Sequence, residues 1–346
     1  MIDIIIPIYN AGILLKRCID SLLNQTDKIG YTIYLIDDGS TDISVNICDE
    51  YALKYKNIKV FHKKNGGCVD ARQYGIDSSK GEYIVFVDAD DFVENDYIVD
   101  LKKALQNSAD YYILNNKRNY IVNDGYYIEK DFLYDGYISK KQIYEWYLSS
   151  KIGAVWDKIY VRKIIDNNKI RFDEKITHGD DFYINIKYLQ SVNTVYCQNT
   201  ASYVHIIDSA VSVCSHDASM KRLYDLKLLR DSVIDMLPSD INEVDIIIFK
   251  KSILNAYFNA IKLMLEDRSV ININDLDRFI SNEYTELYSI KKYASLKEKI
   301  YFWFLFNKKY RIITMIQKIY NTRFYKYLLD RRYRKIDKLI KLRGTK

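Results

Sequence analysis

The sequence predicts an α/β fold with a mostly parallel, doubly wound sheet, followed by an α-helical carboxyl-terminal region. Over residues 2–88, short runs rich in β-branched residues alternate with segments of helical apolar spacing, and this alternation is typical of a parallel sheet. From about residue 217 the apolar spacing instead indicates long helices. We therefore expect a first domain over residues 1–215 and a helical region over residues 216–346.

The first domain is expected to begin with four strands separated by three helices, and to end with shorter elements of both kinds. Asp124-Gly125 favours a tight hairpin turn within its middle part. The expected strands are 2–8, 31–37, 58–62, 82–88, short pieces within 110–135, 194–198 and 201–207. The expected helices are 12–25, 42–56, 68–79, 139–150, 162–168, 181–191, 217–237, 241–267 and 273–285.

Composition indicates an ordinary folded protein, with 48% hydrophobic and 28% charged residues. The five cysteines form no CxxC pair and are an odd number, which argues for reduced thiols in a cytoplasmic protein. The amino terminus MIDIIIPIYN has no basic region before its apolar run, so it predicts a first strand and not a signal peptide. No apolar run near the carboxyl end approaches the roughly 20 residues that span a bilayer.

Charge is distributed unevenly along the chain. Residues 291–346 contain 18 Lys or Arg and 3 Asp or Glu, a net charge of +15, whereas residues 1–290 carry −9. The basic residues of this tail are interleaved with aromatic ones, a pattern that suits an anionic membrane surface, where each nearby Lys or Arg contributes about 1 kcal/mol. The alternative is a solvated helical face packed on the rest of the chain. Nucleic acid is not expected as a partner, because residues 1–290 offer no continuing basic path.

Three carboxylates follow the strand predicted over residues 82–88, in the stretch FVDADDF. Ligands of doubly wound sheets bind at the carboxyl ends of strands. Asp88 and Asp90 there offer hard oxygen ligands to Mg²⁺ or Mn²⁺, ions that take few carboxylates and fill their other positions with substrate phosphates. The alternative is a helix start, in which Asp91 and Glu94 form a capping pair.

A second acidic pair, Asp37-Asp38, lies at a neighbouring strand end in DDGSTD. Such a carboxylate can accept the imide N–H of a uracil or bond a ribose hydroxyl, and Tyr9 on the adjacent strand end can stack on the base. The alternative is an Asx turn with Thr41 or Asp42 capping the next helix.

Arg72 opens the helix after the third strand, behind the glycine-rich segment Asn65-Gly66-Gly67. Backbone N–H groups at a helix start and a guanidinium both suit a diphosphate. Alternatively, Arg72 pairs with Asp70 or Asp88. The spacing matches neither GxGxxG nor GxxxxGK[ST], which counts against a dinucleotide enzyme or a P-loop NTPase.

Six motifs in order make the sequence resemble the inverting family 2 glycosyltransferases of the GT-A fold, of the type found in bacterial polysaccharide biosynthesis. The resemblance covers about residues 1–210. The motifs are PIYN at 7–10, LLNQT at 22–26, DDGSTD at 37–42, NGG…AR at 65–72, GEYIVFVDADD at 81–91 and GDD at 179–181.

The resemblance implies roles for the residues that match these motifs. Asp38 would read the uracil with support from Asp37, Arg72 would lie beside the nucleotide, and Asp88 would reach the ribose or the metal shell. Asp90 would bind Mn²⁺ or Mg²⁺. The full set implied for the nucleotide sugar is Pro7, Tyr9, Asn10, Asp37, Asp38, Arg72, Asp88 and Ala89.

Asp181 matches the catalytic base of the family, and the alternative for Asp180-Asp181 is capping of the helix that follows. The family usually has Glu at position 180, so the supporting or acceptor-binding role of Asp180 stays open. Asp181 would accept the proton of an acceptor hydroxyl that attacks the anomeric carbon, while the metal and Arg72 stabilise the departing diphosphate. One displacement of this kind inverts the anomeric configuration.

Four further residues have open assignments. His205 matches a basic family position that touches the diphosphate or completes the metal shell, or it is a satisfied histidine on a strand. Trp156, Lys158 and His178 fall in segments that border the acceptor site in relatives, although Trp156 can equally be a core residue.

We therefore expect a metal-dependent transferase that moves a sugar from a UDP-sugar to a hydroxyl of a glycan or lipid-linked acceptor in cell-surface polysaccharide assembly. It would work on the cytoplasmic side, peripherally on the plasma membrane. One alternative is a non-catalytic sugar-nucleotide or glycan-binding scaffold, which a missing carboxylate would favour, and none is missing. The other is a nucleotidyltransferase, which a glycine-rich phosphate loop after the first strand would favour, where this sequence has PIYNAG.

Overall fold

The chain forms two compact units in a computed structural model. The first unit comprises residues 1–215 and 224–249, and the second comprises residues 216–223 and 250–346. The domain boundary predicted at residue 215 stays a prediction. In the structure, the helical segment 224–249 belongs to the first compact unit. The structure describes residues 1–122, 125–130, 134–208, 219–266, 272–290, 293, 296–313 and 315.

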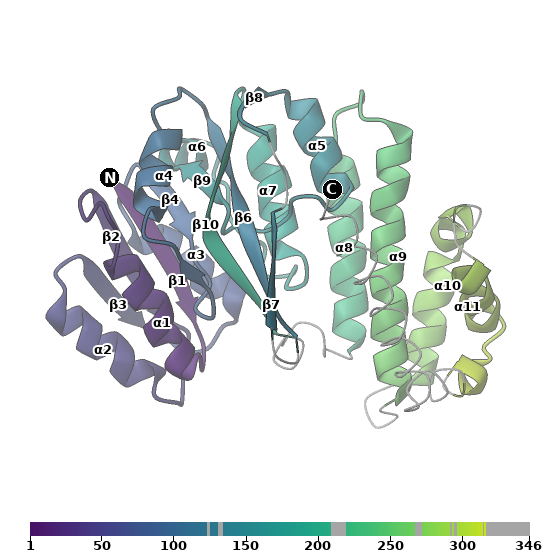
Figure 1. The fold of residues 1–346 in the computed structure, drawn as a ribbon. Helices are drawn as coiled ribbons and strands as arrows, with labels where there is room; N and C mark the ends of the chain where they lie inside the picture. The colour runs from purple at the N-terminus through teal and green to yellow at the C-terminus, as the bar shows by residue number, and fades with distance from the viewer. Residues whose placement is uncertain are drawn as a thin grey trace. The chain divides into compact units, whose positions relative to one another are not determined.

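The first unit begins with a parallel sheet whose strand order is β3-β2-β1-β4. Figure 1 shows α1 and α2 on one face of these strands and α3 on the other, as expected for doubly wound connections. The strands are β1 (Ile2–Ile8), β2 (Tyr31–Asp37), β3 (Ile58–His62) and β4 (Tyr83–Phe86), and the helices are α1 (Gly12–Leu23), α2 (Ser44–Lys54) and α3 (Cys68–Ser78).

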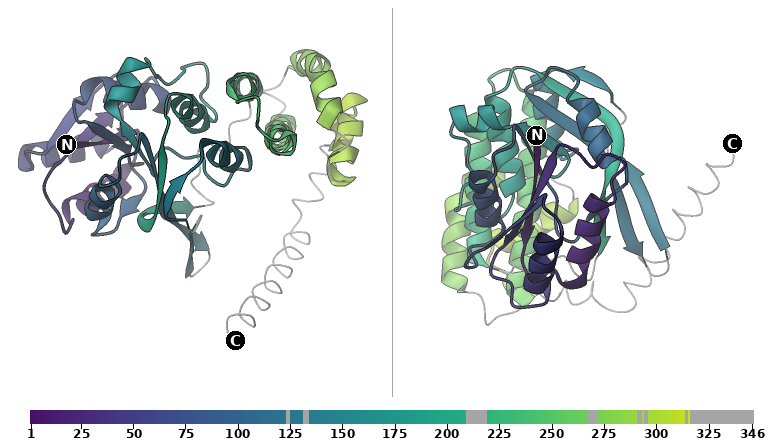
Figure 2. Two further views of the ribbon diagram at one scale, coloured as in Figure 1. Left: turned by 90° about the horizontal axis from the view of Figure 1, so that it is seen from above. Right: turned by 90° about the vertical axis from the view of Figure 1, so that its left-hand side faces the viewer.

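The second half of the sheet is mixed. β9 pairs antiparallel with β4, β6 pairs antiparallel with β9, and β10 pairs parallel with β6. The β6–β7 hairpin extends past its neighbours in both views of Figure 2. The strands are β5 (Phe92–Val93), β6 (Tyr111–Val122), β7 (Gly125–Lys130), β8 (Gly136–Ile138), β9 (Lys158–Val161) and β10 (Val195–Asp208), and the helices are α4 (Tyr97–Ala104), α5 (Lys140–Leu148), α6 (Arg162–Asn167) and α7 (Asp180–Gln190).

The predicted α/β class is confirmed, with two local differences. The separate strands expected at 194–198 and 201–207 form the single strand β10, whose register with β6 shifts between Gln198 and Tyr203. Val122 lies opposite Gly125 in the β6–β7 pair, and Asp124 of the predicted hairpin turn lies outside the described residues.

The core of the first unit explains why these segments fold as they do. Alternate residues of β1 face opposite sides of the sheet, because side chains in a strand have a period of two. Ile4 and Ile6 pack in one cluster with Leu15 and Ile19 of α1. On the other face α3 approaches so closely that a Cβ on Gly75 would lie 2.4 Å from Ile5 Cγ2. The result is a rigid sheet that fixes the loops at its carboxyl end.

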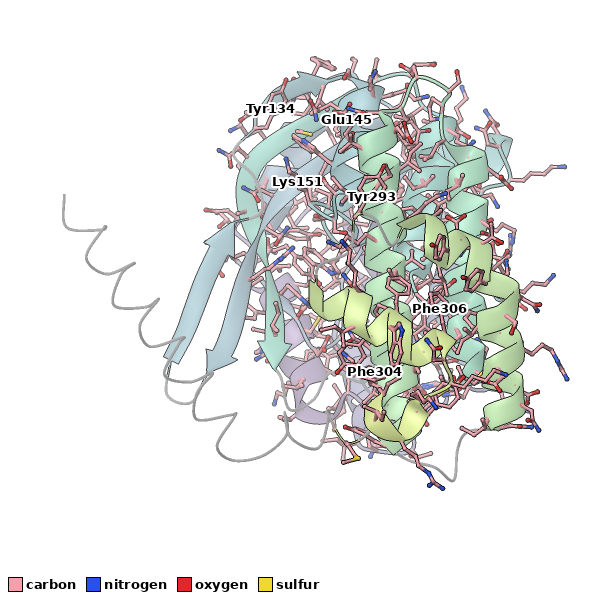
Figure 3. All side chains as sticks on the ribbon, turned by 90° about the vertical axis from the view of Figure 1, so that its right-hand side faces the viewer. Tyr134, Glu145, Lys151, Tyr293, Phe304 and Phe306 are labelled. Carbon is pink, nitrogen blue, oxygen red and sulfur yellow. The ribbon has the colours of Figure 1, made fainter. Side chains whose placement is uncertain are left out.

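The second unit is helical in its described residues. Tyr257 and Phe258 contact Phe279 and Phe302 with ring centroids 5.4 and 5.0 Å apart, which packs α9 against α10 and α11. Phe304 and Phe306 of α11 are labelled in Figure 3. None of the helices among the described residues combines the length and apolar character needed to cross a membrane. The helices are α8 (Met220–Met236), α9 (Glu243–Glu266), α10 (Ile273–Ile290) and α11 (Leu296–Phe306), with α8 and α9 each crossing the boundary between the units.

Only part of the predicted basic tail, residues 291–346, falls within the described residues. Residues 293, 296–313 and 315 are described, and residues 316–346 lie outside. In the described part, Lys299, Lys308 and Arg311 are exposed, together with the indole of Trp303, of which 54% is exposed.

Candidate functional site

The loops after β1 and β2 are joined at the carboxyl end of the sheet. The backbone N–H of Asn10 donates to Ser40 Oγ at 3.0 Å, and Asn10 Oδ1 accepts from the N–H of Thr41 at 2.8 Å. Asn10 has a φ of +48°, in the left-handed region that Asn tolerates better than most residues. Pro7 is half-buried, whereas Tyr9 is 56% exposed, so the tyrosine ring is open to a ligand.

Asp37 is buried at the end of β2 and is held by a histidine. His62 Nδ1 lies 2.7 Å from Asp37 Oδ2, and His62 Nε2 lies 3.1 Å from Asp49 Oδ1. The N–H of Ser40 donates to Asp37 Oδ1 at 3.0 Å. Burial alone would raise the pKa of Asp37, but the hydrogen bonds from Ser40 and His62 outweigh it and lower that pKa.

His62 was not predicted from the sequence to belong to this site. Its pKa is raised chiefly by the hydrogen bond with Asp37. The signal that could have found it is the parallel register of the sheet, which places His62 of β3 directly opposite Asp37 of β2. When one predicted strand ends in His and the neighbouring parallel strand ends in Asp, the two side chains can be expected to form a hydrogen bond.

Asp38 is 2% exposed and already has several donors. The N–H groups of Gly66 and Gly67 donate to its two carboxylate oxygens at 2.9 and 2.7 Å, and Lys63 Nζ forms an ion pair with it. Lys63, which the sequence analysis also missed, pairs in addition with Asp70. A uracil bound as predicted would therefore bond a carboxylate that the loop after β3 already bonds.

Asp88, Ala89 and Asp90 follow β4 in the order predicted from the sequence. Asp88 is half-buried, and its N–H donates to Tyr203 Oη at 3.1 Å. Ala89 is 8% exposed, so a larger residue has little room there, whereas Asp90 is exposed. Removal of water from the Asp90 carboxyl, with the like charges of Asp91 and Asp88, raises the pKa of Asp90 to about 6.

The alternative interpretation of Asp91 as a helix cap with Glu94 is wrong. Asp91 has no exposed surface, and it accepts hydrogen bonds from Tyr203 Oη at 2.6 Å and from the N–H of Ile206 at 2.7 Å. Glu94 pairs instead with Lys117. Helix α4 begins at Tyr97 after the N-cap residue Asp96 and has no side-chain cap hydrogen bond. Asp91 instead ties the D-x-D segment to β10.

His205 of β10 lies beside this segment. Its Nδ1 is 3.1 Å from Asp91 Oδ2, and its ring stacks on Trp156 with centroids 5.1 Å apart. Burial lowers the pKa of His205, but the neighbouring Asp91 carboxylate outweighs burial and raises it. The predicted metal or diphosphate contact stays a prediction, and Nε2 is the nitrogen that would make it.

The GDD motif meets the D-x-D segment through one guanidinium. Arg72 NH1 donates to Asp180 Oδ2 at 2.7 Å and to Asp181 Oδ1 at 2.5 Å, while NH2 donates to Asp88 Oδ1 at 3.1 Å. The pair of Arg72 with Asp88 was foreseen as an alternative from the sequence, but the pairs with Asp180 and Asp181 were not. Asp70, the other foreseen partner, pairs with Lys63.

Asp181 lies in the first turn of α7 in an environment suited to proton transfer. Its Oδ2 accepts from the N–H of Val155 at 3.2 Å. Burial, opposed by Arg72 and helped by the like charges of Asp180 and Asp88, raises the pKa of Asp181 to about 7. A carboxyl with a pKa near the working pH is an effective general base. Gly179, at φ +84°, provides the left-handed turn that starts the helix.

The structure argues against two of the three residues predicted to contact an acceptor. The side chain of Lys158 has no exposed surface and pairs with Asp157, so it faces the core. Trp156 is 7% exposed and stacks on Tyr203 with centroids 4.5 Å apart, so it is a core residue. His178 is half-buried with Nδ1 3.4 Å from Asp225 Oδ2, and its acceptor role stays a prediction.

Among the described residues no ready-made group of three or more His, Cys, Asp or Glu side chains could hold a metal ion. The donors at the D-x-D segment are the carboxylates of Asp88 and Asp90. Two carboxylates fit Mn²⁺ or Mg²⁺, because such ions are commonly held by one or two carboxylates plus substrate phosphates. Burial is the largest cause of the raised pKa of Asp90, and the like charges of Asp91 and Asp88, which a bound cation would offset, add to it.

Comparisons with known proteins show similarity to glycosyltransferases. Residues 3–171 match the family model "Glycosyl transferase family 2". The chain is 34% identical over 220 residues to the glycosyltransferase GlyA of Streptococcus pneumoniae, a match that covers 60% of this chain and 30% of GlyA. It is 27% identical over 306 residues to the cholesterol galactosyltransferase of Borreliella burgdorferi, covering 82% of this chain and 80% of that protein.

The fold has a solved counterpart in S. aureus TarS. The crystal structure of TarS 1–349 in complex with UDP-GlcNAc matches with a TM-score of 0.64 and 21% identity, over 92% of this chain and 91% of that one. The likeness extends across both the mixed sheet and the helical region, and it confirms the predicted fold class. Over residues 3–171 the chain is similar to glycosyl transferase family 2, and its fold is of the predicted GT-A type.

Proposed function

We propose that the protein is a glycosyltransferase that moves a sugar from a UDP-sugar to a hydroxyl of a glycan or lipid-linked acceptor, with inversion at the anomeric carbon. One observation carries this proposal: the carboxylates of Asp88, Asp180 and Asp181 converge on Arg72 at the carboxyl ends of the parallel strands. A donor-binding segment and a candidate base therefore share one site, as a transfer reaction needs.

The nucleotide would lie against the joined loops after β1 and β2. The exposed Tyr9 ring is placed to stack on a base, and Asp38 is the carboxylate that would accept the uracil N3–H. A carboxylate has about four lone-pair sites, and three are used by Lys63, Gly66 and Gly67. One site remains for the base, or one of the loop donors exchanges with it. The UDP-GlcNAc bound to TarS supports a UDP-sugar as the donor class.

Asp88 and Asp90 would hold Mn²⁺ or Mg²⁺, with His205 as a further candidate. When bound, the ion would supply positive charge next to the diphosphate, which makes UDP a better leaving group. The chain itself offers Arg72 Nε, which is buried and has no hydrogen-bond partner among the described residues. An unpartnered buried donor in this place is consistent with an anionic ligand.

Asp181 would act as the general base. The acceptor oxygen forms a bond to the anomeric carbon while the bond from that carbon to the phosphate oxygen breaks, and UDP leaves with the electron pair. The acceptor proton passes to Asp181, whose pKa of about 7 lets it be deprotonated before the reaction and protonated after it. A second carboxylate nucleophile is not needed, so one displacement inverts the configuration.

The acceptor is proposed to be presented at a membrane surface during cell-surface polysaccharide assembly. The relative from Borreliella burgdorferi is named for transfer to cholesterol, a lipid with a hydroxyl, which supports a lipid-linked acceptor. The exposed Lys299, Trp303, Lys308 and Arg311 around α11 supply the cationic and aromatic side chains that anionic membrane surfaces attract.

The proposal is tested by UDP release. The full chain is incubated with UDP-glucose, UDP-galactose and UDP-N-acetylglucosamine, with Mn²⁺ and with EDTA, and Asp90→Ala is compared with wild type. We expect Mn²⁺-dependent release of UDP from at least one donor and loss of that release in Asp90→Ala. Equal turnover in Asp90→Ala would overturn the metal assignment, and no turnover of any nucleotide sugar would overturn the transferase.

A further inference from the structure

Arg72 lies inside the site and not on its surface. It belongs to the first turns of α3, which begins after Gly67, and only 5% of the residue is exposed. Its chain neighbour Ala71 is fully buried against the sheet, so the backbone that carries Arg72 is fixed. A guanidinium in such a place has little freedom to swing toward solvent.

The fork of Arg72 is matched to carboxylates from two distant parts of the chain. NH1 bonds Asp180 and Asp181, which are 108 and 109 residues away, and NH2 bonds Asp88 at the end of β4. The bond to Asp180, at 2.7 Å, has the length typical of a charge-assisted hydrogen bond, whereas the bond to Asp181 is shorter, at 2.5 Å, and the bond to Asp88 is longer, at 3.1 Å. A planar fork can hold three groups in fixed directions, which a single ammonium cannot.

Within the described residues, Arg72 is the only cation that forms an ion pair with Asp88, Asp180 or Asp181. Three carboxylates beside one guanidinium leave the cluster with excess negative charge. Without Arg72, Asp180 and Asp181 would repel each other at the start of α7 with no cation between them. Their side chains would then turn apart or toward water.

Helix α7 itself does not depend on Arg72. Asn185 is fully buried, and its amide donates to the carbonyls of Gly153 and Ala154 at 2.9 and 3.0 Å. Tyr188 donates to the carbonyl of Asp110 at 2.9 Å and accepts from the N–H of Val161 at 2.8 Å. These contacts lie on turns that follow the acidic pair. Removal of Arg72 therefore leaves the helix in place and frees only the carboxylates.

We propose that Arg72 is a positioning residue: it fixes the carboxylates of Asp180 and Asp181 against Asp88, so that the base is held at one place relative to the donor segment. This deepens the proposed function and rests on it. Three of the five N–H donors of Arg72 bond the enzyme's own carboxylates, which leaves Nε and one N–H of NH2 for a substrate. Positioning is thus the main role of this residue, and a diphosphate contact is secondary.

The test compares Arg72→Gln and Arg72→Lys with wild type and with Arg171→Gln. Arg171 is a matched control, because it also bonds a carboxylate, Asp77, through two nitrogens at 3.1 and 2.6 Å, but on the surface. The affinity for UDP with Mn²⁺ is measured by calorimetry, and kcat is measured by UDP release from the best donor. Thermal unfolding of each variant shows that it is folded.

For a positioning residue, kcat falls by about 100-fold in Arg72→Gln, because a catalytic group displaced by about 1 Å loses that much. UDP affinity changes by less than about threefold, because the loss is confined to the transition state. Arg72→Lys, which keeps the charge without the fork, also loses kcat. In Arg171→Gln, kcat and the affinity for UDP are both expected to equal those of wild type. A large loss of UDP affinity with kcat retained, or full rescue of kcat by Lys, would overturn the inference.

A double substitution separates positioning of the base from every other role. In an Asp181→Asn background the base is already absent, so Arg72→Gln should lower kcat by less than about threefold further. A full additional 100-fold loss would show that Arg72 acts elsewhere. If wild type neither binds UDP nor releases it from any donor, the proposed function fails and this inference with it; loss of UDP binding in the Arg72 variants alone overturns only the inference.

Discussion

The carboxylate of Asp181 is half-buried, so water stabilises its negative charge poorly. The carboxylates of Asp180 and Asp88 repel this charge, and the guanidinium of Arg72 partly offsets the repulsion. Burial is the largest influence on its pKa, which is raised to about 7, and Arg72 keeps it from rising further. Asp180, one residue earlier, has the same guanidinium as a partner but no bond to the N–H of Val155. The two acidic residues of the motif therefore have different surroundings, and Asp181 is the one proposed as the base.

The activity should follow the ionisation of Asp181. Only the deprotonated carboxylate can accept a proton, so kcat/KM is expected to rise with pH through about 7, to be level above it, and to fall about tenfold per unit below it. The measurement is the pH profile of UDP release at fixed Mn²⁺, with UDP affinity measured at each pH as a control for donor binding. A profile that is flat from about pH 5 to 9 while affinity is constant would contradict this assignment.

Residues whose environment is set by distant segments could not be assigned correctly from the sequence. Asp91 and Glu94 match a local capping pattern, but the partners of Asp91, Tyr203 and Ile206, are more than 110 residues further along. Lys158 was expected at the acceptor because its segment borders the acceptor site in relatives, yet Asp157 and the carbonyl of Ala154 bond it inside the protein. In contrast, Asp37, Asp38 and the D-x-D were placed correctly at strand ends, since strand direction alone decides that.

At the scale of elements, the loop after β2 depends on the conformation of Gly39. Its φ is +74°, and a Cβ there would lie 2.8 Å from the backbone nitrogen of Asn65. Gly39→Ala is therefore expected to lower the free energy of unfolding by about 1–3 kcal/mol, since it adds both backbone strain and a clash. Gly153→Ala is the control, because nothing lies within 4 Å of a Cβ at Gly153. The check is denaturant unfolding; equal stability of the two variants would contradict the packing of these loops.

Helix α7 should lose its anchor when Asn185 is replaced. The side chain accepts from Tyr111 Oη at 2.7 Å and from Tyr160 Oη, and it donates to two carbonyls. Asn185→Ala removes all four of these buried hydrogen bonds, and a loss of about 2–4 kcal/mol in unfolding free energy is expected. Asn168→Ala, at an exposed helix end, should cost less than about 1 kcal/mol. A similar small effect at both positions would show that α7 is held by other contacts.

The parallel half of the sheet could be predicted from the sequence because each strand is followed by a helix and the direction of such units is fixed. The strand order of the mixed half of the sheet could not be predicted from the sequence. Strands β9 and β5 are four and two residues long, and their places in the sheet depend on pairing with β4, β6 and β10, which lie far away in the chain. Short strands carry too few residues for a periodic pattern, so their order follows from tertiary contacts.

At the scale of the whole molecule, the basic carboxyl-terminal part contrasts with the acidic remainder. The full chain is expected to cosediment with vesicles that contain phosphatidylglycerol and to be released as salt is raised, because attraction to an anionic surface is screened by salt. Vesicles of phosphatidylcholine alone are the control. Equal binding to both, without a salt dependence, would contradict an electrostatic contact with membranes.

The proposed function depends on Asp181 as the base of an inverting transfer from a UDP-sugar. The most direct measurement compares Asp181→Asn with wild type, in UDP release from the best donor and in UDP affinity with Mn²⁺. Removal of a general base is expected to lower kcat by about 100- to 10,000-fold, with UDP affinity within about threefold of wild type. Turnover in Asp181→Asn within about threefold of wild type, with UDP bound equally well, would contradict the claim.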